Sequence, residues 1–155
     1  MTLGAWILVA AVAAAAGIGT WWSLTNGVFR GTRRVRGGPE TGAGHLVQPP
    51  VASVLAGTTY DAARGERATL LQFSSAFCAP CRATRRILSD VARTVPGVAH
   101  VEVDAEHHLD LVRALGVLRT PTTLLLDGEG RELTRATGAP RPGQVLAALE
   151  KGLAR

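Results

Sequence analysis

The chain has 155 residues, enough for one domain of ordinary size with a short extension, and this length excludes two independent catalytic domains. Hydrophobic residues make up 46% and charged residues 19% of the chain, and the formal net charge is +5. Residues 30–49 hold four arginines against one glutamate, which is +3 of that charge. In the remainder of the chain the positive and negative charges nearly balance, so we expect no binding of nucleic acid.

The first element expected is an apolar helix. No charged side chain occurs before Arg30, and residues 3–22 read LGAWILVAAVAAAAGIGTWW, which as a helix would span roughly 30 Å, the thickness of a bilayer core. The pattern predicts an uncleaved transmembrane anchor over residues 1–29. A cleaved signal peptide is the alternative, since Ala13 to Ala16 resemble a cleavage site, whereas the length and uniformity of the run argue against a buried core helix.

A flexible basic linker is predicted over residues 30–49. This segment is rich in Gly, Pro and Arg and has no apolar period, so we do not expect it to pack. Positive residues close to a membrane helix favour the cytoplasmic side of the membrane. The cluster from Arg30 to Arg36 therefore predicts a single-pass protein whose C-terminal part lies in the cytoplasm.

A single folded domain is predicted over residues 50–155. Its apolar pattern switches several times between the period of a strand and the period of a helix. In chain order we expect a strand at Thr69–Ser74, a helix at Ala79–Val95, a strand at Val98–Asp104, a short helix at His108–Leu115, a hairpin of Thr122–Leu126 and Arg131–Thr137, and a helix at Pro142–Leu153. This order predicts an α/β fold in which helices flank a central mixed sheet.

The chemistry is expected at Phe77-Cys78-Ala79-Pro80-Cys81-Arg82, where a predicted strand gives way to a helix. A spacing of three residues on the first helical turn lets the two sulfur atoms reach bonding distance, so Cys78 and Cys81 can alternate between dithiol and disulfide. The helix N-terminus carries partial positive charge, which favours the thiolate of Cys78. Pro80 suits a first turn because its missing N–H has no intrahelical partner there.

Two other interpretations of the cysteines stay open. They can be buried apolar residues, as single cysteines often are, or half of a zinc site completed by His107 and His108. The chain has no second Cys-X-X-Cys pair to complete a structural zinc site, and two cysteines this close together cannot staple a fold. A redox pair explains better why they lie between a strand and a helix.

At these residues the chain resembles the thioredoxin-like family, over residues 50–155. The resemblance rests on FSSAFCAPCR at 73–82, VEVDAE at 101–106 and LGVLRTPTTLLLDGEGRE at 115–132, followed by Thr137-Gly138-Ala139. It implies a thioredoxin-like fold and a thiol-disulfide oxidoreductase that uses no metal and no organic cofactor. Its substrates would be protein disulfides, and a separate reductase would supply the electrons.

The resemblance also implies roles for the residues that match the family pattern. Cys78 is expected to be the exposed thiol that attacks a client disulfide, and Cys81 the shielded thiol that resolves the mixed disulfide. A cis peptide bond is expected at Thr120-Pro121, facing the cysteines. The substrate groove is then expected to be lined by Phe77, Ala79, Pro80, Thr120, Pro121 and Gly138.

Three residues depart from the pattern of the common cytosolic thioredoxins. Phe77 stands in place of a tryptophan and Ala79 in place of a glycine, which leaves the direction of the redox reaction open. Gln72 stands where those proteins carry a buried acid that helps to deprotonate the resolving thiol. A neutral amide cannot accept that proton.

We hypothesise that resolution by Cys81 is slower here, or that His100 or Glu102 accepts the proton instead. These residues alternate with Val101 and Val103 in a predicted strand, so both lie on one face of it. They can equally be ordinary solvent-facing residues.

The predicted function is that of a membrane-tethered thiol-disulfide oxidoreductase. If the domain faces outward, the chain is expected to resemble the tethered thioredoxin-like proteins of cytochrome c maturation or extracytoplasmic disulfide repair. A binding module with a thioredoxin fold and incidental cysteines is the non-catalytic alternative.

Overall fold

The computed structural model describes residues 3–25, 27–31 and 53–154. The described elements, in chain order, are α1 (Leu3–Thr25), β1 (Arg30–Gly31), the short 3-10 helix η1 (Asp61–Ala63), β2 (Ala68–Ser74), α2 (Ala79–Thr94), β3 (Val98–Asp104), α3 (Leu109–Ala114), β4 (Thr122–Asp127), β5 (Glu132–Thr137) and α4 (Pro142–Leu153). Every strand and helix expected between residues 69 and 153 is present, with bounds within one residue of the prediction.

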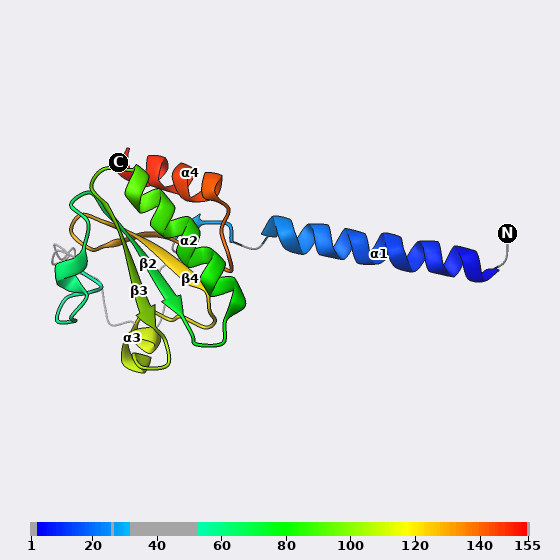
Figure 1. The fold of residues 1–155 in the computed structure, drawn as a ribbon, viewed down its shortest axis with the longest axis horizontal. Coiled ribbons are helices and arrows are strands. Elements are labelled where there is room, and N and C mark those ends of the chain that lie inside the picture. Colours follow the sequence, from blue (N-terminus) through cyan, green and yellow to red (C-terminus); the bar gives the residue numbers. More distant parts are fainter. Residues whose placement is uncertain (1–2, 26, 32–52, 155) are drawn as a thin grey trace, which may run out of the picture.

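The strands form one sheet in the order β1-β5-β4-β2-β3. β2 and β3 are parallel and are joined through α2, whereas the other neighbouring strands are antiparallel, which confirms the predicted mixed sheet. β2, β3 and β5 therefore finish, and β4 begins, at the same end of the sheet. We name this end the cysteine end, because Cys78 follows β2 there (Figure 1).

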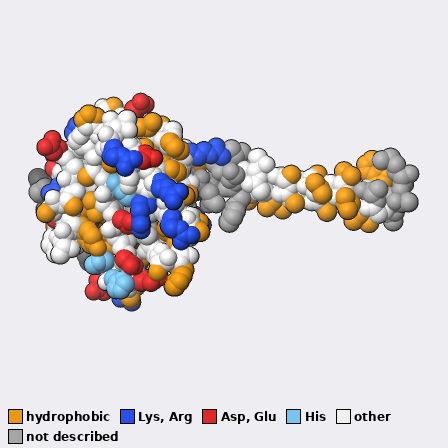
Figure 2. Space-filling view, in the orientation of Figure 1, with side chains coloured by type: hydrophobic (Ala, Val, Ile, Leu, Met, Phe, Trp, Pro, Cys, Tyr) orange, Lys and Arg blue, Asp and Glu red, His pale blue; other side chains and the backbone are white. Residues whose placement is uncertain are grey.

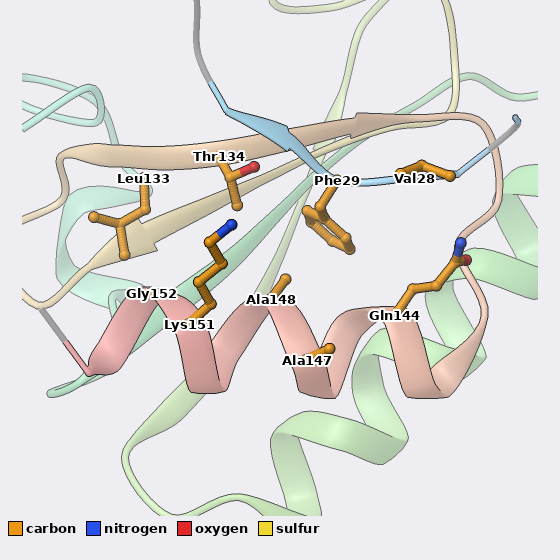
Figure 3. A pocket seen from close by; sticks show the side chains of 9 residues that line it. All are labelled: Val28, Phe29, Leu133, Thr134, Gln144, Ala147, Ala148, Lys151 and Gly152. Carbon is orange, nitrogen blue, oxygen red and sulfur yellow. The ribbon is translucent and has the colours of Figure 1, made fainter.

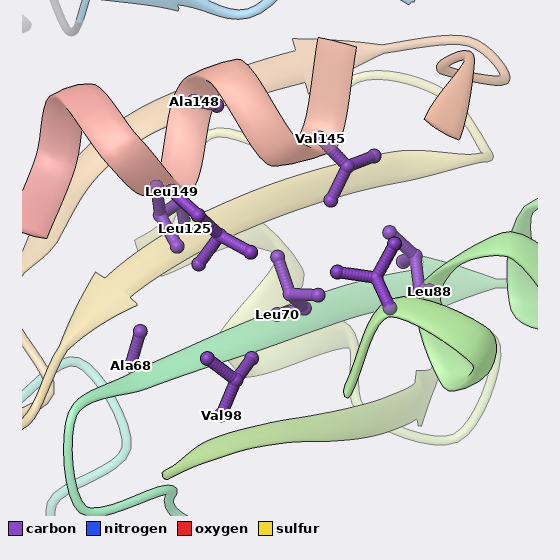
Figure 4. Packing of buried hydrophobic residues seen from close by; sticks show 9 residues of the cluster. Ala68, Leu70, Leu88, Val98, Leu125, Val145, Ala148 and Leu149 are labelled. Carbon is purple, nitrogen blue, oxygen red and sulfur yellow. The ribbon is translucent and has the colours of Figure 1, made fainter. Parts of the chain in front are cut away.

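Apolar side chains cover both faces of the sheet. α2 and α4 lie over one face, and the buried side chains there include Leu70, Leu88, Leu125, Val145 and Leu149 (Figure 4). The segment before β2 and α3 lie over the other face, where the buried side chains include Leu55, Phe73, Val103, Val117 and Leu124. Burial of apolar area on both faces supplies the main free energy that favours folding.

The predicted N-terminal helix is present as α1, which projects away from the rest of the chain (Figure 1). It has no charged residue, and its large apolar side chains, such as Trp6, Leu8 and Ile18, are exposed. In the described part of the chain no helix reaches the combined length and apolarity required of a membrane span, so the predicted transmembrane helix is not confirmed.

The start of the predicted linker packs, contrary to expectation. Arg30 and Gly31 form β1, which pairs with Arg135 and Thr134 at the edge of the sheet. Just before them, Val28 and Phe29 line an apolar hollow of about 310 Å³ over α4 (Figure 3). The prediction failed here because an edge strand offers free backbone groups to any extended segment, whatever its side-chain pattern. The remainder of the predicted linker, from residue 32, lies outside the described residues.

Candidate functional site

The Cys78–Cys81 pair forms the first turn of α2. The two cysteines are joined by a disulfide, with their Cα atoms 5.2 Å apart. Cys78 is the N-cap residue, and the backbone N–H of Cys81 lies 3.1 Å from the carbonyl oxygen of Cys78 and 3.2 Å from its Sγ. Pro80 is in the first turn, as the sequence predicted. The bond between the two sulfurs fits neither buried apolar cysteines nor ligands of a zinc site.

The two sulfur-bearing residues differ in exposure. Cys78 is partly exposed, whereas Cys81 is only 2% exposed beneath the turn. Phe77, directly before the pair, is 99% exposed, so its ring contacts almost nothing in the domain. A client disulfide can therefore approach Cys78 but not Cys81.

A second loop at the cysteine end contains the Thr120-Pro121 peptide bond, which is cis as expected. The backbone N–H of Gly138 donates to the carbonyl oxygen of Pro121 at 2.8 Å, and Gly138 has a φ of 88°, which a side chain would strain. The hydroxyl groups of Ser75 and Thr120 lie 3.1 Å apart. This contact joins the loop before Cys78 to the loop of the cis proline, so these residues are at one site.

A polar hollow of about 440 Å³ lies beside the disulfide. It is lined by Tyr60, Ser74, Ser75, Ala76, Cys78, Cys81, Arg82, Arg85, Glu102 and Asp104. Of the two residues expected as proton acceptors, the hollow includes Glu102 but not His100. The contribution of Tyr60 could not be predicted, because this residue belongs to an irregular segment that precedes β2.

Glu102 is fixed in that hollow by three contacts. Its Oε1 accepts a hydrogen bond from Arg85 at 2.7 Å and another from the Ser74 hydroxyl, and its Oε2 lies 2.5 Å from Nε of Arg85. Burial by itself raises the pKa of Glu102, but the donated hydrogen bonds and the positive charge of Arg85 outweigh it, so the pKa lies below its ordinary value. Glu102 is therefore a carboxylate at neutral pH.

His100 reaches the disulfide only through Gln72. The Gln72 amide nitrogen donates to the carbonyl oxygen of Cys81 at 3.0 Å, so its Oε1 faces Nε2 of His100 at 3.1 Å. Nε2 of His100 must then carry the proton, and Nδ1 accepts from Ser89 at 2.9 Å. The basic nitrogen of His100 consequently faces away from the cysteines.

Burial lowers the pKa of His100 more than the negative charge of Glu102 raises it. The imidazole is therefore neutral at pH 7. Both residues contact groups on the α2 side of the sheet, which confirms that they share one strand face.

Basic side chains gather on the exposed face of α2 beside the pair (Figure 2). Arg85 is bound to Glu102, whereas Arg82 lines the hollow without an ion pair in the described part of the chain. His107 pairs with Asp104, and His108 with the hydroxyl of Tyr60. Among the described residues, no three His, Cys, Asp or Glu side chains are grouped as a metal site would require.

A bonded Cys-X-X-Cys pair at a helix N-terminus, with a cis-proline loop at the same end of a mixed sheet, defines a class of redox-active α/β domains. The sequence profile of the thioredoxin-like domain family matches residues 59–153, which is more than half of the chain. The chain therefore belongs to the thioredoxin-like domain family. This membership and the Cys78–Cys81 pair support a thiol-disulfide oxidoreductase.

Several thioredoxins are similar to this chain. The chain is 29% identical over 76 residues to thioredoxin H-type 1 of Nicotiana tabacum and 31% identical over 70 residues to thioredoxin H-type of Fagopyrum esculentum. These matches cover 49% and 45% of this chain, and the chain spans 60% of the length of each relative. The crystal structure of thioredoxin from Trypanosoma brucei brucei is similar with a TM-score of 0.52 and 26% identity, over 61% of this chain and 81% of that one.

Proposed function

We propose that this protein is a membrane-tethered thiol-disulfide oxidoreductase that exchanges or reduces protein disulfides through Cys78 and Cys81. The observation that carries the proposal is the asymmetry of the bonded pair: Cys78 is partly exposed at the N-terminus of α2, and Cys81 is buried behind it. A site of this kind can receive a client sulfur at one cysteine only, and it protects the other for an internal attack.

The proposed reaction starts from the dithiol form. The thiolate of Cys78 attacks one sulfur of a client disulfide, forms a mixed disulfide and expels the other client sulfur as a thiolate, which takes a proton. Cys81 then loses its proton and attacks Sγ of Cys78, which releases the client dithiol and leaves the Cys78–Cys81 disulfide seen in the structure. A separate dithiol reductase returns two electrons and two protons to the pair.

Glu102 is the better placed of the two candidate proton acceptors. Its carboxylate shares the polar hollow with both cysteines, and the hollow has room for water to relay a proton. His100 directs a protonated nitrogen toward Gln72 and its basic nitrogen toward Ser89. We therefore assign the proton from Cys81 to Glu102, with His100 as a group that positions Gln72.

The client is proposed to bind across the exposed side of the pair. Phe77, Ala79 and Pro80 surround Cys78 on an exposed loop and helix turn, and the cis proline loop and Gly138 lie at the same end of the sheet. An extended client segment can pair with the backbone beside Pro121, as peptides do when they add to a sheet, while Phe77 contacts its apolar side chains. Thr120 fixes this loop through its contact with Ser75.

The tether is proposed to be the N-terminal segment 1–29. α1 carries no charged residue and its described side chains are exposed, and a helix of that kind is ordinarily surrounded by protein or lipid. The arginine cluster from residue 30 supports a cytoplasmic domain. Protease treatment of intact and lysed spheroplasts that express the protein with a C-terminal tag tests on which side of the membrane the domain lies. Protection of the tag until lysis supports a cytoplasmic domain. Digestion of the tag in intact spheroplasts supports the extracytoplasmic alternative.

Reduction of insulin by the purified chain, with dithiothreitol as electron donor, tests the proposed activity. We expect the parent protein to accelerate precipitation of the insulin B chain and Cys78→Ser to lose that acceleration. Ala83→Ser is a matched control, because it places a serine on the exposed face of the same helix, away from the client-binding loops, and leaves both sulfurs. Equal activity of the parent and Cys78→Ser would support the non-catalytic binding module instead.

A further inference from the structure

α1 leaves the domain at the cysteine end of the sheet. β1 runs antiparallel to β5, so the chain just before β1 lies beside the last residue of β5, where the backbone N–H of Gly27 donates to the carbonyl oxygen of Thr137 at 2.9 Å. The next residue, Gly138, contacts Pro121 through its own N–H. Gly27, which follows α1, therefore lies next to the end of β5, and the residue after β5, Gly138, lines the proposed client groove.

The connection between α1 and the domain has almost no slack. α1 ends at Thr25, and Gly27, two residues later, is already bonded to β5. Gly27 is buried with a φ of 74°, and a Cβ there would lie 2.3 Å from the carbonyl oxygen of Ala139, so only glycine fits against this backbone. Phe29 then packs against the core cluster that includes residues of α4, and its ring lies between β1 and α4 (Figure 3).

The cysteine end also has an apolar and basic surface. Phe77 and Leu118 are 99% and 95% exposed on the two loops that flank the disulfide. Arg119 lies on the same loop as Leu118, and Arg82 lies on the helix turn that follows Phe77; both arginines are exposed. Such a surface suits contact with the apolar segments and anionic headgroups found where a membrane protein emerges from its bilayer.

We infer that the cysteine end faces the membrane to which α1 is tethered, and that the client disulfides are those of membrane proteins lying close to the bilayer surface. The inference rests on the proposed function and adds the class of client. The short connection keeps Cys78 at the end of the domain nearest to α1. A disulfide at the bilayer surface therefore meets Cys78 at a high effective concentration, whereas one on a long soluble domain does not.

The test uses the full chain, reduced beforehand, in vesicles of phosphatidylcholine and phosphatidylglycerol. The clients are single-span peptides with a small disulfide loop, either directly outside the bilayer or beyond a long Gly/Ser spacer, together with the same loop as a soluble peptide. We expect the parent to reduce the near loop at least about tenfold faster than the spaced loop. A Gly/Ser insertion after Thr25 should remove this preference and leave reduction of the soluble loop unchanged.

Gly27→Ala provides a second variant, which should release β1 and weaken the same preference. Gly143→Ala is its control, because a Cβ at Gly143 meets open space. Equal rates on both tethered loops in the parent, with the soluble loop still reduced, would overturn the inference and leave the oxidoreductase intact. If the parent fails to reduce the soluble loop, the proposed function is overturned. If the chain fails to float with vesicles, the proposed tether is overturned. Either result would also overturn the inference about the client.

Discussion

The side-chain amide of Gln72 donates a 3.0 Å hydrogen bond to the carbonyl oxygen of Cys81 from within the core. Gln72 is fully buried on β2, and its amide nitrogen also lies 3.3 Å from the hydroxyl of Ser74. A carboxylate at this position could not donate either bond. The amide therefore fixes the turn that carries the buried sulfur, and the task of accepting its proton passes to another group.

Gln72→Asp should accelerate the resolving step, because it restores an acid beneath Cys81. The change also leaves the Cys81 carbonyl without its amide donor, so we expect it to lower the free energy of unfolding by about 1–3 kcal/mol. The rate is measured as release of a chromophoric thiol from its mixed disulfide with Cys78, and the stability by urea unfolding. A resolving rate no faster than that of the parent would contradict the idea that the amide slows resolution.

Glu102→Gln should slow the same resolving step by at least about tenfold, because the hollow then lacks its carboxylate. Arg85→Gln is the matched variant: it removes the hydrogen bonds and charge that lower the pKa of Glu102, so the carboxylate becomes a stronger base. We expect Arg85→Gln to resolve faster at neutral pH and to shift the acidic limb of the rate profile upward. Unchanged profiles in both variants would remove Glu102 from the proton path.

His100 should make the protein less stable as the pH falls below about 6.5, the ordinary pKa of histidine. Because burial lowers the pKa of His100 in the folded state, the unfolded chain binds the proton first as the pH falls. The contribution of neutral His100 is therefore fully present above 6.5 and is lost between 6.5 and the lower folded-state pKa. Urea unfolding across this range should show a smaller loss of stability in His100→Gln than in the parent, and an equal loss in both would contradict this role of His100.

The helices and strands could be predicted because each carries a regular apolar period. The Cys-X-X-Cys spacing was sufficient to predict the bonded pair, whereas the cis peptide was predicted only through the resemblance to the thioredoxin-like family. β1 could not be predicted, since two residues have no period and their pairing depends only on the free edge of β5. Likewise, the alternation of β3 placed His100 and Glu102 on one face but gave no information on their partners. Those partners come from α2 and β2 and depend on tertiary packing.

Phe77→Ala should weaken client binding without affecting the fold. The Phe77 side chain is almost fully exposed, so its removal should change the free energy of unfolding by less than about 0.5 kcal/mol. We expect a severalfold higher KM for an apolar disulfide peptide at nearly constant kcat, and the same for Leu118→Ala on the opposite loop. Phe73→Ala is the structural contrast, because that ring is buried and its loss should cost about 3–5 kcal/mol. A KM unchanged by both exposed substitutions would contradict an apolar client contact.

Thr123→Val should stabilise the protein. Thr123 is fully buried on β4 beside Gln72, and within the described part of the chain its hydroxyl is a buried side-chain oxygen that has no hydrogen-bond partner. Valine has nearly the same shape and removes that unpaired group, so we expect a gain of about 1 kcal/mol in the free energy of unfolding. The neighbouring residue offers a close control, because the hydroxyl of buried Thr122 donates to the carbonyl oxygen of Arg119 at 2.8 Å. Thr122→Val should therefore lower the free energy of unfolding by about 1 kcal/mol. Urea denaturation of both variants decides the matter, and a loss of stability in Thr123→Val would mean that its hydroxyl has a partner in solution.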